Sequence, residues 1–210
     1  MLAGRSHPYA LVLAAGDGSR FGGDKLLAPF HGTPLVTHAA TTVAQAISAG
    51  ILAGGVAVVG PNDTRLTWHL DAAGLRIIQN PATGSGLASS LKRGLAALAD
   101  PLTQPAADAA VIILADQPLL APSVIAELVA KWREEGRSVR PRYGSPPDQP
   151  GHPVLLDRSL WPLARNLTGD QGLGHLLKGM PEAIVVIDVP GANPDVDTRD
   201  DLQQLEDSTG

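Results

Sequence analysis

Residues 13–25 read LAAGDGSRFGGDK and follow directly on a short apolar run, residues 9–13. The glycines let backbone N–H groups approach a phosphate closely, and Arg20 and Lys25 can neutralise its charge. A short motif of this kind can also be a flexible, glycine-rich surface turn. The combination of accessible backbone N–H groups and two cations favours a loop that binds a triphosphate.

The spacing within this loop excludes two common nucleotide-binding motifs. A Walker A loop requires Ser or Thr after its lysine, but Leu26 follows Lys25. A dinucleotide fingerprint requires glycine at its sixth position, where this chain has Phe21, and the third glycine comes one residue late. The loop is therefore typical of neither a P-loop NTPase nor a dinucleotide-dependent oxidoreductase.

Short apolar runs alternate with segments of helical periodicity along the chain. We expect strands at 10–13, 56–59, 75–78, 111–114 and 184–187. We expect helices at 34–47, 86–98, 122–132 and 198–205, with Thr33, Ser85 and Thr198 as their N-caps where a cap is recognisable. Thr198 and Asp201 have the spacing of a capping box. This alternation predicts an α/β protein with a mainly parallel sheet.

Two segments interrupt the alternation. Residues 100–107 are expected to form a loop before the central strand, and the proline-rich residues 140–151 an excursion that could cover a site. No internal repeat, low-complexity tract or linker divides the chain. We therefore expect one domain over residues 1–210.

Composition limits the classes of function. The 210 residues carry a net charge of −5, which argues against a general nucleic-acid-binding protein. The chain has no cysteine, which excludes disulfides, thiolate metal sites and cysteine nucleophiles. It has neither a long apolar run nor a signal-peptide core, so we expect a soluble cytoplasmic protein that contacts no membrane.

Three carboxylates are candidate metal ligands. Asp116 follows the apolar run 111–115, and a strand end is where ligands bind in a parallel sheet. Asp195 and Asp197 lie on one side of an extended segment, where their repulsion requires a compensating cation or donors. Oxygen ligands of this kind suit Mg²⁺. The alternatives are that Asp116 forms a turn and that Asp197 only interacts with the helix N-terminus.

Other polar residues are weaker candidates. Ser85, Ser89 and Ser90 begin a helix after the Asn80 loop and could contact a sugar, a base or a phosphate. The histidines lack the spacing of a zinc site, and only His152, between Gly151 and Pro153, suggests a ligand contact. The sequence also lacks the Gly-x-Ser-x-Gly motif of a serine hydrolase.

Seven segments in order resemble the nucleotidyltransferases of molybdenum cofactor maturation, and most closely their cytidylyltransferase branch. They are LAAGDGSRFG (13–22), KLLAPFHGTPL (25–35), GSGLASSLKRGL (84–95), LADQPL (114–119), GHPVL (151–155), LTGDQG (167–172) and DVDTRDDL (195–202). The resemblance implies a three-layer αβα sandwich like that of the nucleotide-diphospho-sugar transferases. It also implies transfer of CMP from CTP to the terminal phosphate of molybdopterin, with release of pyrophosphate.

The resemblance assigns roles to particular residues. It implies catalytic roles for Arg20, Lys25 and Asp116, and Mg²⁺ binding by Asp116, Asp195 and Asp197. The implied nucleotide-binding residues are Leu13, Ala14, Ala15, Gly16, Gly18, Ser19, Arg20, Lys25, Asn80, Gly84, Ser85, Ser89 and Ser90. The implied acceptor-binding residues are Gln117, Pro118, Gly151, His152, Pro153, Gly169 and Asp170.

The nucleotide half is then expected at about 8–120 and the acceptor-facing half at about 121–205. A molybdenum hydroxylase that receives the cofactor is the implied protein partner.

Several alternatives remain open at this stage. Ala15 is typical of the cytidylyl branch, whereas Gly22 to Lys25 is equally similar to the guanylyl branch. Relatives commonly have arginine where this chain has Gly174, so another phosphorylated acceptor is a second candidate. A non-catalytic NTP-binding maturation factor is a third.

Overall fold

The computed structural model describes residues 6–16, 18–144 and 151–210, and over these residues it contains one large sheet of seven strands and a two-stranded hairpin. The order in the large sheet is β5-β4-β1-β6-β8-β7-β9. The strands are β1 (Pro8–Ala14), β4 (Gly54–Val59), β5 (Arg76–Gln79), β6 (Ala109–Leu114), β7 (Ser138–Tyr143), β8 (Val154–Asp157) and β9 (Ile184–Val189). All neighbours pair in parallel except β8, which is antiparallel to β6 and β7.

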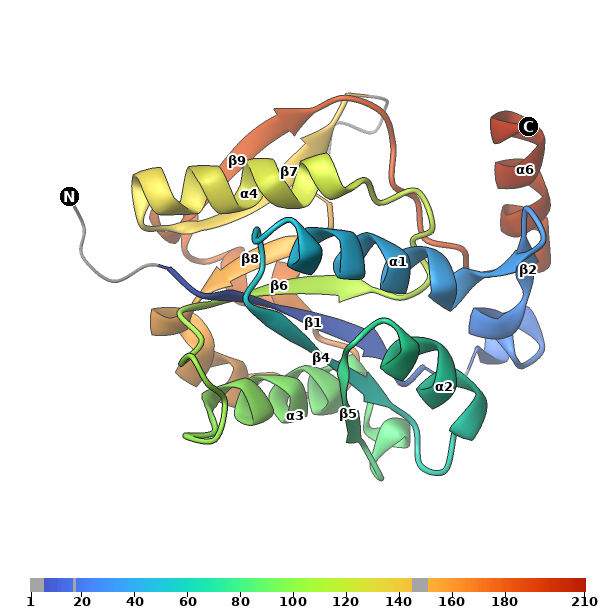
Figure 1. The fold of residues 1–210 in the computed structure, drawn as a ribbon, viewed down its shortest axis with the longest axis horizontal. Helices are drawn as coiled ribbons and strands as arrows, with labels where there is room; N and C mark the ends of the chain where they lie inside the picture. Colours follow the sequence, from blue (N-terminus) through green and yellow to red (C-terminus); the bar gives the residue numbers. More distant parts are fainter. Residues whose placement is uncertain (1–5, 17, 145–150) are drawn as a thin grey trace.

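Helices cover both faces of this sheet (Figure 1). They are α1 (Leu35–Ser48), α2 (Thr64–Ala72), α3 (Leu87–Ala99), α4 (Pro122–Glu135), α5 (Leu173–Leu177) and α6 (Arg199–Thr209). One core lies between the sheet and α1, α2 and α4, and a second lies between the sheet and α3, α5 and the 3-10 helix η4 (Arg158–Asn166). The alternating side chains of β1 enter both cores, because successive residues of a strand point to opposite faces. The structure is therefore the three-layer αβα sandwich that the resemblance implied.

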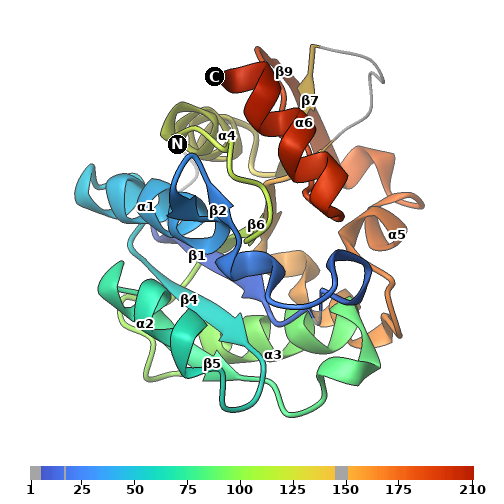
Figure 2. The same ribbon diagram turned by 90° about the vertical axis from the view of Figure 1, so that its right-hand side faces the viewer.

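The C-terminal helix α6 lies apart from these two layers, beside the hairpin β2 (Pro29–Phe30) and β3 (Thr33–Pro34) (Figure 2). A third apolar cluster joins them, with Phe21, Phe30, Leu35, Val196 and Leu205 as its buried members. This cluster ties the glycine-rich loop and the C-terminal segment to the same corner of the molecule.

The structure confirms the five expected strands and four expected helices, with boundaries shifted by a few residues. Residues 100–107 form the expected loop. Two caps were wrong: Thr33 pairs in β3 while Pro34 takes the N-cap position of α1, and Gly86 rather than Ser85 precedes α3. The expected excursion at 140–151 was also wrong in its first part, because residues 140–143 belong to β7. Residues 145–150 lie outside the described residues.

Several elements were not anticipated from the sequence. The helices α2 and α5 are short, β8 has only four residues, and most of β7 lies in the proline-rich segment that was expected to form an excursion. Within the described parts of the chain, no helix combines the length and apolar character needed to cross a bilayer.

Candidate active site

The carboxyl ends of β1 and β6 bring the glycine-rich loop and Asp116 together. These strands pair in parallel with Leu13 opposite Leu114, and the backbone N–H of Ala115 donates to the carbonyl oxygen of Leu13 at 3.2 Å. The chain leaves β1 into the loop and leaves β6 into the turn at Asp116. The loop and Asp116 therefore share one rim of the sheet, the edge formed by the carboxyl ends of its parallel strands.

Glycines give the loop its shape. Gly18 has φ +60° and Gly22 φ +90°, and these two residues flank a 3-10 turn, η1 (Ser19–Phe21). The carbonyl oxygen of Gly18 accepts from the backbone N–H groups of Phe21 and Gly23, at 2.9 and 3.2 Å. Since a positive φ strains residues with a Cβ atom, glycine is required where the chain reverses. The buried Phe21 ring anchors the turn, so that Arg20 and the following Lys25 are directed toward the rim.

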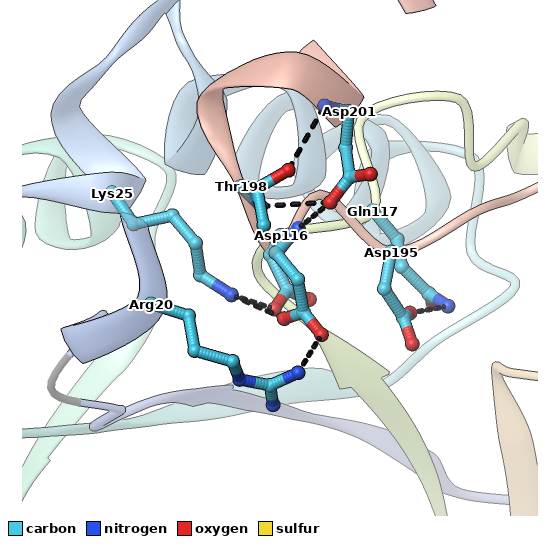
Figure 3. A network of polar contacts seen from close by, with 8 residues as sticks. Arg20, Lys25, Asp116, Gln117, Asp195, Thr198 and Asp201 are labelled. Carbon is cyan, nitrogen blue, oxygen red and sulfur yellow. Dashed lines mark hydrogen bonds and ion pairs between the residues drawn. The ribbon is translucent and has the colours of Figure 1, made fainter. Parts of the chain in front are cut away.

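Lys25 and Arg20 form ion pairs with two carboxylates (Figure 3). The ammonium group of Lys25 lies 2.7 Å from Asp116 Oδ2 and 3.2 Å from Asp197 Oδ1. The guanidinium of Arg20 lies 2.9 Å from Asp197 Oδ2. The Lys25 side chain is only 13% exposed, whereas that of Arg20 is 77% exposed. Lys25 is therefore an internal cation of the site, and Arg20 is available to an incoming anion.

Burial and charge shift two pKa values in this cluster. Burial opposes the charged form of the Lys25 ammonium, but the neighbouring carboxylates of Asp116 and Asp197 outweigh it, and the pKa of Lys25 is raised. Burial raises the pKa of Asp195, and the negative charge of Asp116 adds to this effect. The rim therefore has an excess of negative charge that one lysine does not fully compensate.

The 195–197 segment is held against β6 by its backbone. The N–H of Val196 donates to the carbonyl oxygen of Asp116 at 3.1 Å. The capping box at the start of α6 is confirmed, and in it Asp201 accepts from the backbone N–H groups of Asp197 and Thr198. Asp201 thus caps the helix, while the Asp197 carboxylate faces Lys25 and Arg20. Of the three candidate metal ligands, Asp116 and Asp197 both contact Lys25, whereas Asp195 accepts from the Gln117 amide at 2.5 Å.

The donor atoms present are compatible with a divalent cation. Within the described residues, Asp116 Oδ1 is buried and has no hydrogen-bond partner. In the same part of the chain, no three or more acidic or histidine side chains are arranged as a complete metal site. Mg²⁺ is ordinarily held by one or two carboxylates together with water and substrate phosphates. An orphaned carboxylate oxygen beside an excess of negative charge fits that kind of incomplete protein site.

A cleft of about 840 Å³ extends from these charges along the sheet edge. This volume lies within the range of small-molecule sites in proteins. Its lining contains most of the residues expected to bind nucleotide, namely Leu13, Ala15, Gly16, Ser19, Arg20, Gly84, Ser85 and Ser90, together with Asp116. An adjoining pocket is lined by Ala14, Gly18 and Lys25. The sequence gave no reason to select Thr83, Leu87 or Leu114, although Leu114 could have been found as the parallel neighbour of Leu13.

Asn80 and Ser89 support the cleft rather than line it. The buried Asn80 amide donates to Ser89 Oγ at 2.8 Å and to Ser90 Oγ at 3.0 Å, and its oxygen accepts from the N–H of Ala82. Ser89 Oγ in turn donates to the carbonyl oxygens of Ala82 and Gly86. These bonds explain the serine pair on an otherwise apolar helix and hold the segment before α3 in place.

The residues expected to bind the acceptor do not form one group. Gln117 and Pro118 are buried, and the Gln117 amide exchanges hydrogen bonds with Asn193. Asn193 also donates to the carbonyl oxygen of His152 at 3.2 Å, so this buried amide joins the Gly151-His152-Pro153 segment to the aspartate rim. 

Gly169 and Asp170 lie elsewhere, in the cleft that also contains Gly84 and Ser85.

His152 is a neutral residue at physiological pH. Burial, together with the nearby positive charge of Arg140, lowers the pKa of His152 to about 4. Burial likewise lowers the pKa of Arg140 and raises the pKa of Tyr143 to about 12. The Tyr143 hydroxyl donates to the His152 carbonyl oxygen at 2.9 Å. The His152 carbonyl oxygen is therefore held by two hydrogen bonds, and the positive charge beside the neutral imidazole is that of Arg140.

Comparison with known families identifies this arrangement. The family model described as the MobA-like NTP transferase domain matches residues 10–184, which include most of β1, the glycine-rich loop and Asp116. The chain belongs to the MobA-like NTP transferase family. No curated protein matches the sequence. Family membership makes the chain a nucleotidyltransferase, with a nucleoside triphosphate as a substrate.

Solved structures of similar fold cover almost the whole chain. Rv0371c from Mycobacterium tuberculosis H37Rv is 25% identical, with a TM-score of 0.78 over 97% of this chain and 100% of that chain. Its homolog from Mycobacterium sp. strain JC1 is 29% identical, with a TM-score of 0.77 over 97% of each chain. A complex of Rv0371c with manganese has a TM-score of 0.74 at 24% identity, over 96% of this chain and 99% of that chain. The family's fold is thus present without large insertions or deletions.

Proposed function

We propose that this nucleotidyltransferase transfers CMP from CTP to the terminal phosphate of a molybdopterin-type acceptor and releases pyrophosphate. The observation that carries the proposal is the pairing of Lys25 with Asp116 and Asp197 at the rim, where a nucleotide-sized cleft begins. Both reactants are polyanions. A site that combines cations with carboxylates able to hold a metal ion can neutralise the negative charge of both reactants, and it needs no protein nucleophile.

In this mechanism the acceptor phosphate oxygen attacks the α-phosphorus of the nucleotide in line, and the bond to pyrophosphate breaks. The exposed Arg20 guanidinium binds the β- and γ-phosphates and stabilises the charge that develops on the leaving group. Lys25 exchanges its carboxylate partners for phosphate oxygens. The backbone N–H groups of the loop, including those of Gly18 and Ser19, orient the triphosphate.

Asp116, with Asp195 and Asp197, would hold a divalent cation, which we propose is Mg²⁺. Bound there, the cation would neutralise charge on the phosphate oxygens. The buried and unpaired Asp116 Oδ1 supports this role, as does the manganese complex of Rv0371c. Gln117 donates to Asp195 and so keeps that carboxylate near the rim.

The nucleotide half of the chain, at about 8–120, then supplies the base pocket. We propose that Ala14, Ala15 and Gly16 contact the base. Ala15 is buried in the floor of the cleft, where its methyl group reduces the space for a purine. Gly84, Ser85 and Ser90 would contact the sugar or the base, while Asn80 and Ser89 hold them in position.

The acceptor-facing half, at about 121–205, would contribute the Gly151-His152-Pro153 segment. Its link through Asn193 to Gln117 supports an acceptor position beside the aspartate rim. The nearby guanidinium of Arg140 offers a positive charge to a phosphate-bearing acceptor. A molybdenum hydroxylase would then receive the nucleotide-bearing cofactor.

The test is pyrophosphate release from CTP and from GTP, with Mg²⁺ and with molybdopterin either present or absent. The expected result is release with CTP that requires molybdopterin. Release with GTP alone would replace the cytidylyl assignment by a guanylyl one. Nucleotide binding without release would contradict transfer to molybdopterin and favour another phosphorylated acceptor or a non-catalytic NTP-binding factor.

Two variants test the roles of the rim. Asp116→Asn should lower kcat by roughly 100-fold or more, because it removes the charge that the proposed metal site depends on. Asp188→Asn is the matched control, since Asp188 is an exposed carboxylate paired with Arg142 at the edge of the sheet. Similar rates in Asp116→Asn and the control would contradict the assigned role.

A further inference from the structure

Asp170 is held in the nucleotide cleft by an unusually close backbone contact. The carbonyl oxygen of Gly169 accepts from the N–H of Ala88 in the first turn of α3 at 3.0 Å. Gly86, just before that helix, has φ +78°, and a Cβ there would lie 2.3 Å from the Gly169 carbonyl carbon and 2.7 Å from Asp170 Oδ1. The carboxylate of Asp170 therefore lies directly over the segment that begins α3.

The turn that carries Asp170 is fixed on both sides. The Gln171 backbone N–H donates to the Thr168 carbonyl oxygen at 3.1 Å, and the Gln171 side-chain oxygen accepts from the Thr168 N–H at 3.0 Å. Lys92 of α3 donates to the carbonyl oxygen of Leu167 at 3.0 Å. A side chain presented by such a turn loses little conformational freedom when it binds a ligand, which is the property expected of a recognition residue.

The charges of the cleft determine what Asp170 can contact. Arg20 is the cation among the described lining residues, and it lies at the rim with Asp116. Apart from Arg20, Asp116 and Asp170, the described lining of the cleft consists of glycine backbone, apolar side chains and the hydroxyls of Ser19, Thr83, Ser85 and Ser90. A carboxylate repels phosphate, so the part of the cleft around Asp170 suits neither the triphosphate nor the acceptor phosphate. It suits an uncharged group that donates hydrogen bonds.

We propose that Asp170 is a specificity-determining residue whose carboxylate accepts a hydrogen bond from the exocyclic amino group of cytosine. This inference rests on the proposed use of a nucleoside triphosphate and replaces the acceptor-binding role that the sequence motif implied for Asp170. Aspartate is a known partner of the cytosine amino group. Uracil presents a carbonyl oxygen at the same position, which would face the carboxylate without a proton between them. Asp170 thus favours CTP over UTP.

The experiment measures the affinities of the full chain for CTP and UTP in the presence of Mg²⁺ by calorimetry, without any acceptor. The expected result is that Asp170→Asn reduces the ratio of CTP to UTP affinity by about 10-fold or more, because an amide can also donate to the uracil oxygen. Glu182→Gln is the control, since it removes one negative charge from a 3-10 turn outside the cleft. Its ratio should equal that of the unmodified chain.

A second variant tests the same contact through the backbone. Gly86→Ala should displace the turn at Gly169 and also lower the CTP-to-UTP ratio, while circular dichroism verifies that the chain is folded. An unchanged ratio in Asp170→Asn would overturn the proposal. Equal loss of affinity for CTP and UTP, with no such loss for 2′-deoxy-CTP, would overturn it in favour of a ribose contact.

The outcome is separable from that of the proposed function. If the unmodified chain binds CTP selectively but releases no pyrophosphate with molybdopterin, the proposed acceptor fails while Asp170 is still judged by the affinity ratio. If Asp170→Asn keeps the affinity ratio and only weakens molybdopterin binding, the residue belongs to the acceptor site and the proposal is wrong.

Discussion

Replacing Lys25 by methionine removes the central charge of the rim and keeps most of the apolar stem. The ammonium group makes two charge-assisted hydrogen bonds, at 2.7 Å to Asp116 and 3.2 Å to Asp197. Such bonds contribute about 1.5–3 kcal/mol each, and the bond to the more exposed Asp197 must be discounted for screening by solvent. We therefore expect the free energy of unfolding to fall by about 2–3 kcal/mol at pH 7.

The same variant should respond more strongly to a divalent cation. Without Lys25, the carboxylates of Asp116, Asp195 and Asp197 repel one another with less compensation. Mn²⁺ or Mg²⁺ bound between them would restore part of the lost stability. At equal metal concentration, the increase in unfolding free energy should be larger in Lys25→Met than in the unmodified chain.

Urea unfolding followed by tryptophan fluorescence measures both effects, since Trp132 and Trp161 are buried in the two cores. The control is Arg65→Met. Arg65 pairs with Asp24 at 2.5 Å, but both side chains are more than half exposed, so the loss of unfolding free energy should be much smaller than in Lys25→Met. Equal stability of Lys25→Met and the unmodified chain, or equal metal responses, would refute the view that Lys25 is the counter-ion of the rim.

Three further changes test the structure elsewhere. His152 has a folded-state pKa of about 4 against 6.5 when unfolded, so the unfolded chain binds the proton more readily and stability falls as pH drops through this window. His152→Gln should remove up to about 3 kcal/mol of that pH dependence in urea titrations at pH 7 and pH 4. Gly94→Ala should lower the free energy of unfolding by about 2 kcal/mol, because the new Cβ would lie 2.2 Å from the buried Leu11 side chain. A thermal midpoint equal to that of the unmodified chain would contradict this prediction. Thr198→Ala should lower the free energy of unfolding by about 1 kcal/mol, because the Thr198 hydroxyl no longer accepts from the Asp201 N–H. Thr198→Ser should restore most of this free energy in the same unfolding assay.

The glycine-rich loop and the strand ends were predictable because their chemistry is local. The strand, the glycines and the two cations of the loop lie within one short segment, and the parallel sheet then places Asp116 on the same rim. The capping box of Thr198 and Asp201 also depends on residues close in sequence. Such features need no knowledge of distant contacts.

Other features depended on contacts between distant segments. The cap at Ser85 was wrong because the glycine at the next position accommodates the turn of Gly169, which lies far along the chain. Most of strand β7 was assigned to an excursion because the prolines of residues 140–151 are typical of a loop, but this strand pairs with β8 and β9. Tertiary pairing supplied what the local pattern lacked.

The sequence by itself determined an α/β protein with a mainly parallel sheet, the glycine-rich loop and the set of candidate carboxylates, because periodicity, glycine content and charge are properties of short segments. Only the tertiary structure decided which of these side chains contact one another. It placed Lys25 between Asp116 and Asp197, and it brought Asp170 into the cleft beside Gly86. The physical reason is that hydrogen bonds and ion pairs depend on positions within a few ångströms, which are set only when the sheet and its two helical layers pack together.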